Sequence, residues 1–254
     1  MFRLDLLREP RLLLEGGQQV PLGRKDAALL AVLAIDGAYS REALARWFWP
    51  DASDERARGN LRQRRFRLAA EAGRDIIEAG QVLRLSGVFT PRYTDPRREL
   101  EADPAALSGD LLEGLTFDEL PEFALWLDSA RQRWRRARAS ALESIALERE
   151  VDCRLDEAVI FAHRLAYEER LSDHAHRMLM RLLYTRGDIG AALEAYRRFA
   201  DLLAIEMGEL PDDATTELAV AMRRGMLCRE GVPAGLPGNV IGGRQSNERV
   251  SSEL

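Results

Sequence analysis

The stretch RARGNLRQRRFR, residues Arg56–Arg67, contains six arginines and no acidic residue. The complete chain of 254 residues has a formal net charge of −5, so this stretch is a local exception in an acidic protein. Arginine at this density favours contact with a polyanion such as a nucleic acid. The elements on either side of the stretch decide which fold presents it.

The arginine-rich stretch lies inside a predicted helix, residues 54–72, that ends at Gly73. Two shorter helices are predicted before it. Residues 26–36 are almost wholly apolar, and residues 41–49 follow Ser40, a residue type that caps helix N-termini. Three helices with short connections favour a helix-turn-helix arrangement.

Short apolar runs flank the three helices on both sides. They are residues 2–7, 11–15, 18–22, 76–77 and 82–85. We predict a small three-stranded sheet at the N-terminus and a β-hairpin after the third helix. Sheet, three helices and hairpin, in this order, indicate a winged helix-turn-helix. In such a domain the third helix enters the major groove of DNA, and the hairpin, or wing, lies along the backbone or minor groove.

The helix 54–72 has two different sides when successive residues are placed about 100° apart. Ala57, Leu61, Leu68 and Ala72 share one side and are predicted to face the core. The outward side and its borders, with one residue of the hairpin, supply the candidate DNA contacts: Arg58, Asn60, Arg62, Gln63, Phe66, Arg67 and Arg84. Arginine can bind O6 and N7 of guanine, and glutamine N6 and N7 of adenine, whereas arginines on phosphates give affinity without sequence information.

Two arginines of the helix do not fit the outward side. Arg64 and Arg65 lie at the two edges of the inward side, where an unpaired buried charge is strongly disfavoured. We expect their guanidinium groups to reach solvent or to pair with carboxylates. A solvated helix face whose arginine stems cover apolar surface is the structural alternative to a DNA-reading face.

The second half of the chain is predicted to be helical throughout. A long amphipathic helix, residues 120–150, has apolar residues spaced by three or four: Phe123, Leu127, Ala130, Trp134, Ala137, Ala141 and Ile145. Segments beginning at Leu155 and Ile189 then align at an offset of 34 residues, so that Ala158 matches Ala192. This is the tetratricopeptide period. The predicted fold is mainly α: a winged helix-turn-helix domain followed by an all-α tetratricopeptide-like domain.

Charge also divides the chain into unlike parts. Residues 1–99 contain 18 Arg and Lys against 14 Asp and Glu, whereas residues 100–254 contain 19 against 28. We predict a DNA-binding domain over residues 1–97 and a helical-repeat domain over residues 98–226. Residues 227–254 are rich in Gly, Pro and Ser and are expected to form a flexible tail.

The sequence disfavours several kinds of site and location. The chain begins without a signal-peptide pattern, and no run is apolar enough to span a membrane, so we expect a cytoplasmic protein without a membrane partner. Cys153, Cys228 and the three histidines lack metal-ligand spacing. Neither a phosphate-binding loop nor a catalytic motif occurs. We therefore expect no enzyme activity, no metal and no cofactor.

Longer stretches resemble known domains. Four stretches resemble an OmpR-type winged helix: LDLLREPRLLLEGGQQVPL (4–22), ALLAVLA (28–34), SREALARWFWPD (40–51) and ARGNLRQRRFRL (57–68). Three later stretches resemble a bacterial transcriptional activator domain: GDLLEGL (109–115), FALWLDSARQRW (123–134) and RMLMRLLYTRGDIGAALEAYRRFADLL (177–203). From Phe2 to about Met226 the chain thus resembles regulators that join these domains, the antibiotic regulatory protein (SARP) class.

The resemblance implies a sequence-specific DNA-binding transcriptional regulator, usually an activator, with double-stranded DNA and RNA polymerase as partners. It also implies a homodimer held by the helical domain. The polymerase contact is implied in the loop before the third helix, at Asp51, Ser53, Asp54 and Glu55. The chain departs from the family pattern at Arg64 and Arg65, where apolar residues are usual.

A non-enzymatic helical-repeat scaffold, whose winged helix no longer binds DNA, is the alternative function. The feature that separates the two is the acid-free arginine face, which a protein-binding scaffold does not need.

Overall fold

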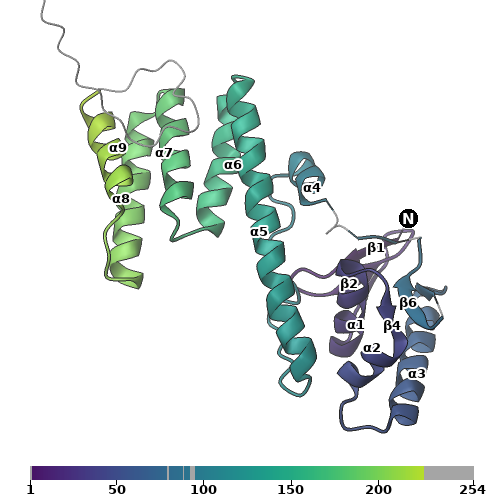
Figure 1. Cartoon of the computed structure of the whole chain (residues 1–254). Helices are drawn as coiled ribbons and strands as arrows, with labels where there is room; N and C mark the ends of the chain where they lie inside the picture. Colours follow the sequence, from purple (N-terminus) through teal and green to yellow (C-terminus); the bar gives the residue numbers. More distant parts are fainter. Residues whose placement is uncertain (1, 79, 88, 92–94, 226–254) are drawn as a thin grey trace, which may run out of the picture.

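The computed structural model describes residues 2–78, 80–87, 89–91 and 95–225 (Figure 1). The described helices are α1 (Arg24–Ile35), α2 (Arg41–Phe48), α3 (Asp54–Ala72), α4 (Pro96–Ala102), α5 (Pro121–Val151), α6 (Leu155–Glu168), α7 (Asp173–Arg186), α8 (Ile189–Glu206) and α9 (Asp213–Arg223). A small α/β part contains α1–α3, and the long helix α5 leads from it to a stack of helices, α6–α9 (Figure 1). The predicted fold class, a winged helix-turn-helix followed by an all-α repeat domain, is confirmed.

Four short strands form the N-terminal sheet, in the order β3-β2-β1-β7: β1 (Phe2–Asp5), β2 (Arg11–Leu13), β3 (Gln19–Pro21) and β7 (Phe89–Pro91). The three predicted strands are confirmed. β1 and β2 are antiparallel with Leu4 opposite Leu12, and both leucines are completely buried. β7 lies parallel to β1 and is not evident from the sequence, because three residues carry too little periodicity.

A second sheet forms the wing, in the order β4-β6-β5: β4 (Tyr39–Ser40), β5 (Ile77–Glu78) and β6 (Val82–Leu85). β5 and β6 are the predicted hairpin, although Ala79 of its turn lies outside the described residues. β4 adds a contact that the sequence does not reveal. Ser40 lies opposite Val82, and its hydroxyl also accepts a hydrogen bond from the amide of Ala43 at the start of α2.

α3 is attached to the core through a narrow stripe. Its buried residues are Ala57, Leu61, Leu68 and Ala72, the four that were predicted to face inward. Each leucine contributes about 1.5–3 kcal/mol by leaving water. Gly73, at φ +71°, ends the helix in the left-handed conformation. Because so few residues anchor α3, most of its surface is available for contacts outside the fold.

The long helix α5 belongs to two hydrophobic cores. Phe123 and Leu127, near its start, pack in the core that contains α1, α2 and α3. Trp134 and Ile145, farther along, pack in the core that contains α6 and α7. One continuous helix therefore joins the winged-helix part to the repeats without a flexible break.

The predicted limit between residues 97 and 98 falls inside α4, which begins at Pro96 and is capped by the carboxylate of Asp95. The division at this position stays a prediction. The tail predicted over residues 227–254 lies outside the described residues.

The buried face of α5 differs from its predicted face at Ala137, and also at Ala141, which is only partly buried while Leu142 is completely buried. Ala137 was predicted to be on the apolar side but is exposed, whereas Arg138 is buried. Arg138 is accepted there because Nε binds the Glu168 carboxylate and Nη1 donates to the carbonyls of Leu107 and Gly109. A charge with this many partners replaces the small apolar residue that simple periodicity favours.

The segment before α5 is clamped between the two parts of the molecule. On one side, Leu112 N donates to the carbonyl of Leu6, and Leu7 forms a bridge with Leu111. On the other side, Arg131 of α5 donates to the carbonyls of Leu111 and Leu112, at 2.8 Å each. These hydrogen bonds fix the connection, so the winged-helix part is held against α5 rather than tethered to it.

The helical repeats have the register that the sequence indicates. Ala158 of α6 and Ala192 of α8 are both completely buried. Gly187, at φ +99°, ends α7 and allows the short turn into α8. Within the described ranges, the helices are too short or too polar to cross a membrane.

Candidate nucleic-acid interface

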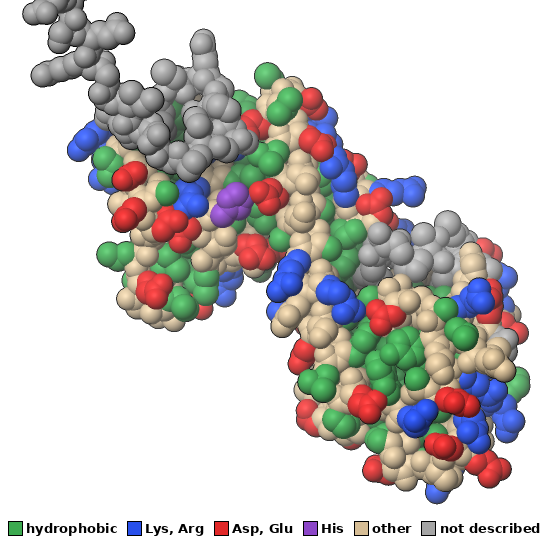
Figure 2. Space-filling view, in the orientation of Figure 1, with side chains coloured by type: hydrophobic (Ala, Val, Ile, Leu, Met, Phe, Trp, Pro, Cys, Tyr) green, Lys and Arg blue, Asp and Glu red, His purple; other side chains and the backbone are tan. Residues whose placement is uncertain are grey.

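The outward face of α3 is polar, basic and open to solvent. Arg62, Gln63, Phe66 and Arg67 are exposed, and Arg58 is half-buried. In Figure 2, blue side chains gather at the lower right, where α3 lies in Figure 1. The structure therefore brings most of the predicted contact residues together on one helix face.

The arginines of this face differ from most others in how they are paired. Within the described part of the chain, Arg56, Arg58 and Arg62 form no ion pair. By contrast, the arginines from Arg131 to Arg198 all pair with carboxylates, except Arg136. Unpaired guanidinium groups keep all their donors available for an external anion.

Two other arginines of α3 are held by one buried carboxylate. Asp26 of α1 is only 5% exposed, and its oxygens lie 2.8 Å from Arg64 Nη1 and 3.6 Å from Arg67 Nη2. The expectation that Arg64 pairs with a carboxylate is confirmed. Arg67 is still more than half exposed, so it faces solvent while part of its charge is balanced by Asp26.

Arg65 bonds to the wing instead of a carboxylate. Its Nη2 donates to the carbonyl of Ile77, at 3.2 Å. This bond joins the middle of α3 to the start of the hairpin. Arg64 and Arg65 therefore position the helix from its two edges, and the departure from the family pattern does not disturb its regular geometry over Asp54–Ala72.

Two of the predicted contact residues have surroundings that limit their reach. Asn60 is half-buried and lines a hollow with Trp49, Glu119 and the exposed Arg56, toward the start of α5. It therefore lies away from Arg62. Arg84 of the wing is exposed, and its Nε lies 3.4 Å from Glu78 on the neighbouring strand.

The turn between α2 and α3 is acidic and exposed. Asp51, Asp54 and Glu55 point into solvent at the start of α3, where negative charge also favours the helix dipole. Ser53 has a structural role, because its hydroxyl accepts a hydrogen bond from the amide of Arg56 and so caps the helix.

Lys25 anchors the other end of this turn. Its Nζ donates to the carbonyl of Phe48 at 3.0 Å and lies 5.5 Å from the centre of the Trp49 ring. Burial in this place lowers the pKa of Lys25. The turn is therefore fixed at both ends and presents its acidic residues in a defined direction.

The structure adds Arg56 and Gly59 to the residues of interest. Arg56 is exposed, and on the helical wheel it lies between Gln63 and Arg67, a position that the sequence alone could have shown. Gly59 lies one turn before Gln63, and a β-carbon built at this glycine would meet nothing within 4 Å. The fold itself does not require glycine there.

Comparison with family models supports the same interpretation. The model of the bacterial transcriptional activator domain (BTAD) matches residues 86–223, more than half of the chain. The chain belongs to the bacterial transcriptional activator domain family. The match agrees with the resemblance of the helical part of the sequence to a bacterial transcriptional activator domain.

One solved structure has a similar fold, Mycobacterium tuberculosis EmbR in complex with a low affinity phosphopeptide. The TM-score is 0.55 at 23% sequence identity, and the match covers 89% of this chain and 66% of that chain. At this identity the likeness concerns the fold alone. A comparison with curated proteins finds no match.

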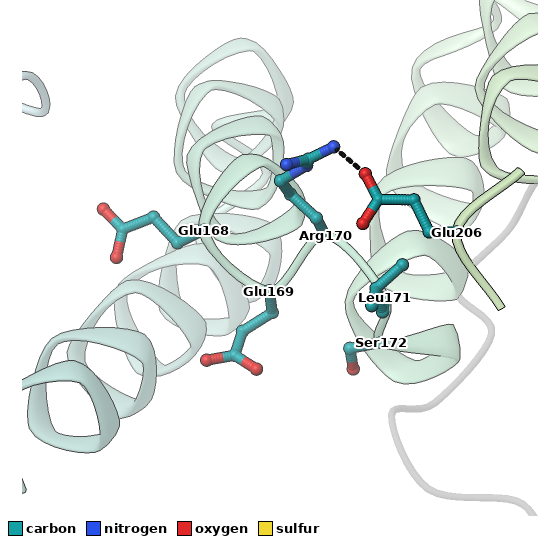
Figure 3. Close-up of a pocket in the computed structure, with 6 residues that line it drawn as sticks. All are labelled: Glu168, Glu169, Arg170, Leu171, Ser172 and Glu206. Carbon is teal, nitrogen blue, oxygen red and sulfur yellow. Dashed lines mark hydrogen bonds and ion pairs between the residues drawn. The ribbon is translucent and has the colours of Figure 1, made fainter. Parts of the chain in front are cut away.

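The activator-domain part of the regulator has two hollows of its own. One, of about 420 Å³, lies at the turn between α6 and α7, where Arg170 forms an ion pair with Glu206 of α8 (Figure 3). The other, of about 510 Å³, is a mostly apolar groove over α7, with Val159 and Ala166 of α6 on one side and Ala195 of α8 on the other. The first hollow is lined mostly by charged and polar side chains, and the second mostly by apolar ones.

Proposed function

We propose that this BTAD-family regulator binds duplex DNA by placing α3 in the major groove. The observation that carries the proposal is the stretch Arg56–Arg67 of α3, which contains no acidic residue and in which Arg56, Arg58 and Arg62 form no ion pair within the described part of the chain. A scaffold that binds only proteins has no need for a cluster of arginines without carboxylate partners. Arg62 and Gln63 are the residues proposed to contact bases, while Arg56 and Arg58 contact phosphates.

The partners of the other α3 arginines support these different roles. Arg64 and Arg65 hold α3 against α1 and the wing, so they position the helix but do not read DNA. The wing residue Arg84 is proposed to contact the backbone next to the groove that α3 occupies. Recruitment of RNA polymerase to DNA, and so activation, is the proposed output, in keeping with the bacterial transcriptional activator domain that the chain contains.

A titration of the full chain against genomic DNA fragments at two salt concentrations tests the proposal. We expect binding that weakens steeply as salt rises, because phosphate contacts release counterions. Binding that is absent at low salt, or independent of salt, contradicts DNA binding and favours the scaffold.

Arg62→Ala and Gln63→Ala are the variants that test base reading. Each is expected to lower the affinity for a selected site by about 1–3 kcal/mol, or roughly 5- to 150-fold, and to relax the preference at one base pair. Arg136→Ala is the matched control, because this exposed arginine of α5 also lacks an ion pair among the described residues. If all three variants lose the same amount of affinity, the result contradicts the assignment of Arg62 and Gln63 as base contacts.

Dimerisation is proposed to occur through the helical domain. The apolar groove over α7, and the exposed side chains of Ile205 and Leu210 at the far end of α8, offer surface that the described fold leaves uncovered. Light scattering at micromolar concentration measures the oligomeric state. A strict monomer, with and without DNA, contradicts this part of the proposal.

The polymerase contact is proposed at the α2–α3 turn, through Asp51, Asp54 and Glu55. Their exposure and the anchoring of the turn by Lys25 support it. A transcription assay in vitro with the three residues changed to Ala is expected to lose activation while DNA binding is kept. If this variant also loses DNA binding, the result contradicts a polymerase contact that is separate from the DNA-binding face.

A further inference from the structure

Phe66 is a large apolar side chain on the outward face of α3. It is 69% exposed, although it lies in the middle of α3, between residues that anchor the helix. Within the described residues it stacks on no other ring. The fold covers less than a third of this side chain, so most of its apolar surface is available to a partner outside the chain.

The neighbours of Phe66 are the residues proposed to read bases. Arg62 and Gln63 lie one helical turn before it on the same face, and both are exposed. Ala69 and Ala70 lie one turn after it and are too small to shield the ring. The ring therefore stands clear of α3 beside two hydrogen-bonding side chains.

The chemistry of the major groove limits what such a ring can recognise. The base edges there present hydrogen-bond donors and acceptors, with one apolar group among the four standard bases, the 5-methyl of thymine. We infer that Phe66 is a specificity-determining residue that recognises the 5-methyl group of a thymine in the major groove. The inference rests on the proposed DNA binding and adds to it the kind of base that one side chain selects.

The position of the thymine follows from helix geometry. One turn of an α-helix advances by about 5.4 Å. Base pairs follow one another at about 3.4 Å along the duplex. The thymine is therefore expected within about two base steps of the base pairs bound by Arg62 and Gln63.

The test uses DNA that lacks only the methyl group. Sites are first selected from a random duplex pool with the full chain, and each thymine of the selected site is then replaced singly by deoxyuridine. We expect one position at which this replacement weakens binding about fourfold, the effect of losing one buried methyl-sized group. At the other thymines, affinity is expected to stay unchanged.

Phe66→Ala then assigns the effect to this residue. The variant is expected to bind the thymine and uracil forms of that position equally well, whereas Arg136→Ala keeps the difference. Phe66 is exposed, so its removal leaves the core intact, and a thermal melt checks this. The thymine-to-uracil difference is read within each variant, so a general loss of affinity does not imitate the result.

The outcomes separate this inference from the function on which it rests. If no site is selected and no salt-dependent binding occurs, the proposed function fails. If a site is selected but no thymine position responds to uracil, or if Phe66→Ala keeps the response, the assignment of Phe66 is overturned. A variant that changes only the oligomeric state shows that Phe66 contacts protein instead, and overturns it as well.

Discussion

At the scale of single residues, the arginines of α3 divide by their partners and not by their position in the sequence. Arg62 has no ion pair among the described residues, whereas Arg64, two positions later, lies against the buried carboxylate of Asp26. Since a helix turns about 100° per residue, neighbouring arginines face different surroundings. Asp26 thus separates an arginine that supports the fold from one that is free to bind.

Asp26→Asn tests this structural pairing. We expect the free energy of unfolding to fall by about 1–3 kcal/mol, because Arg64 and part of Arg67 lose the charge that balances them. Urea denaturation measures the change. Asp128→Asn is the control, since Asp128 is 72% exposed and lies 3.9 Å from Arg131; its effect is expected to stay below about 0.5 kcal/mol. Similar losses in both variants contradict a special role for Asp26.

Asp212 provides a pH-dependent test at the other end of the molecule. Burial alone would raise the pKa of Asp212, but hydrogen bonds from Arg177 and Thr215 outweigh burial and lower the pKa to about 2, from an ordinary 3.8. The folded state therefore favours the ionised carboxylate. Its contribution to stability is complete above about pH 4 and is lost as the pH falls toward 2.

The variant Asp212→Asn keeps the oxygen that caps α9 and removes the charge. At neutral pH it is expected to be less stable than the natural chain by about 0.2–1 kcal/mol, since the ion pair is partly exposed. Thermal melts at several pH values compare the two. The difference is expected to shrink between pH 4 and 2, and a constant difference contradicts the assigned cause.

At the scale of elements, α3 combines a narrow buried stripe with a glycine that its packing does not need. Gly59 lies in the helix interior, where glycine costs about 0.5–1 kcal/mol relative to alanine. The space around its α-carbon is open. Under the proposed DNA binding, a missing side chain at this position lets α3 approach the groove closely, which is the proposed reason for this glycine.

Gly59→Ala is therefore expected to stabilise the fold and to weaken DNA binding. The free energy of unfolding should rise by about 0.5–1 kcal/mol while affinity for DNA falls. Gly73→Ala is the matched control, because φ is +71° there and the same substitution is expected to destabilise by about 1–2 kcal/mol. A Gly59→Ala variant that binds DNA as tightly as the natural chain contradicts the close approach.

At the scale of the whole molecule, the connection before α5 makes the winged-helix part and the repeats one mechanical unit. Leu112 bonds to Leu6, and Arg131 and Arg138 of α5 hold the carbonyls on the other side of the same segment. α5 itself contributes to both cores. The helical domain and the winged helix are therefore joined through packed and hydrogen-bonded groups.

Arg138→Met tests this connection. The variant leaves the buried Glu168 carboxylate with one arginine fewer and removes the hydrogen-bond donor of the Leu107 and Gly109 carbonyls. We therefore expect the free energy of unfolding to fall by about 3 kcal/mol. Limited proteolysis is expected to cut the segment between residues 103 and 112 faster. Arg136→Met, on the exposed side of α5, serves as control. Unchanged proteolysis in Arg138→Met contradicts the role of this residue as a clamp.

Local sequence patterns were sufficient for much of the fold. The bounds of α3, its buried residues Leu61 and Leu68, and the register of Ala158 with Ala192 all follow from periodicity and helix caps. The helix bounds and the buried stripe depend on residues within one or two turns of each other, and the register of the repeats depends on a pattern that recurs after 34 residues. A repeating apolar pattern records them directly because each helix has to bury its own stripe.

Partners distant in sequence were decided only by the tertiary structure. Asp26 meets Arg64, Arg65 meets the carbonyl of Ile77, and Arg138 replaces Ala137 in the buried face of α5 because segments far apart in the chain come together there. The sequence by itself determined the helices and the arginine-rich face. The tertiary structure decided which arginines are held and which remain free, since a charge is neutralised by neighbours in space and not by neighbours in sequence.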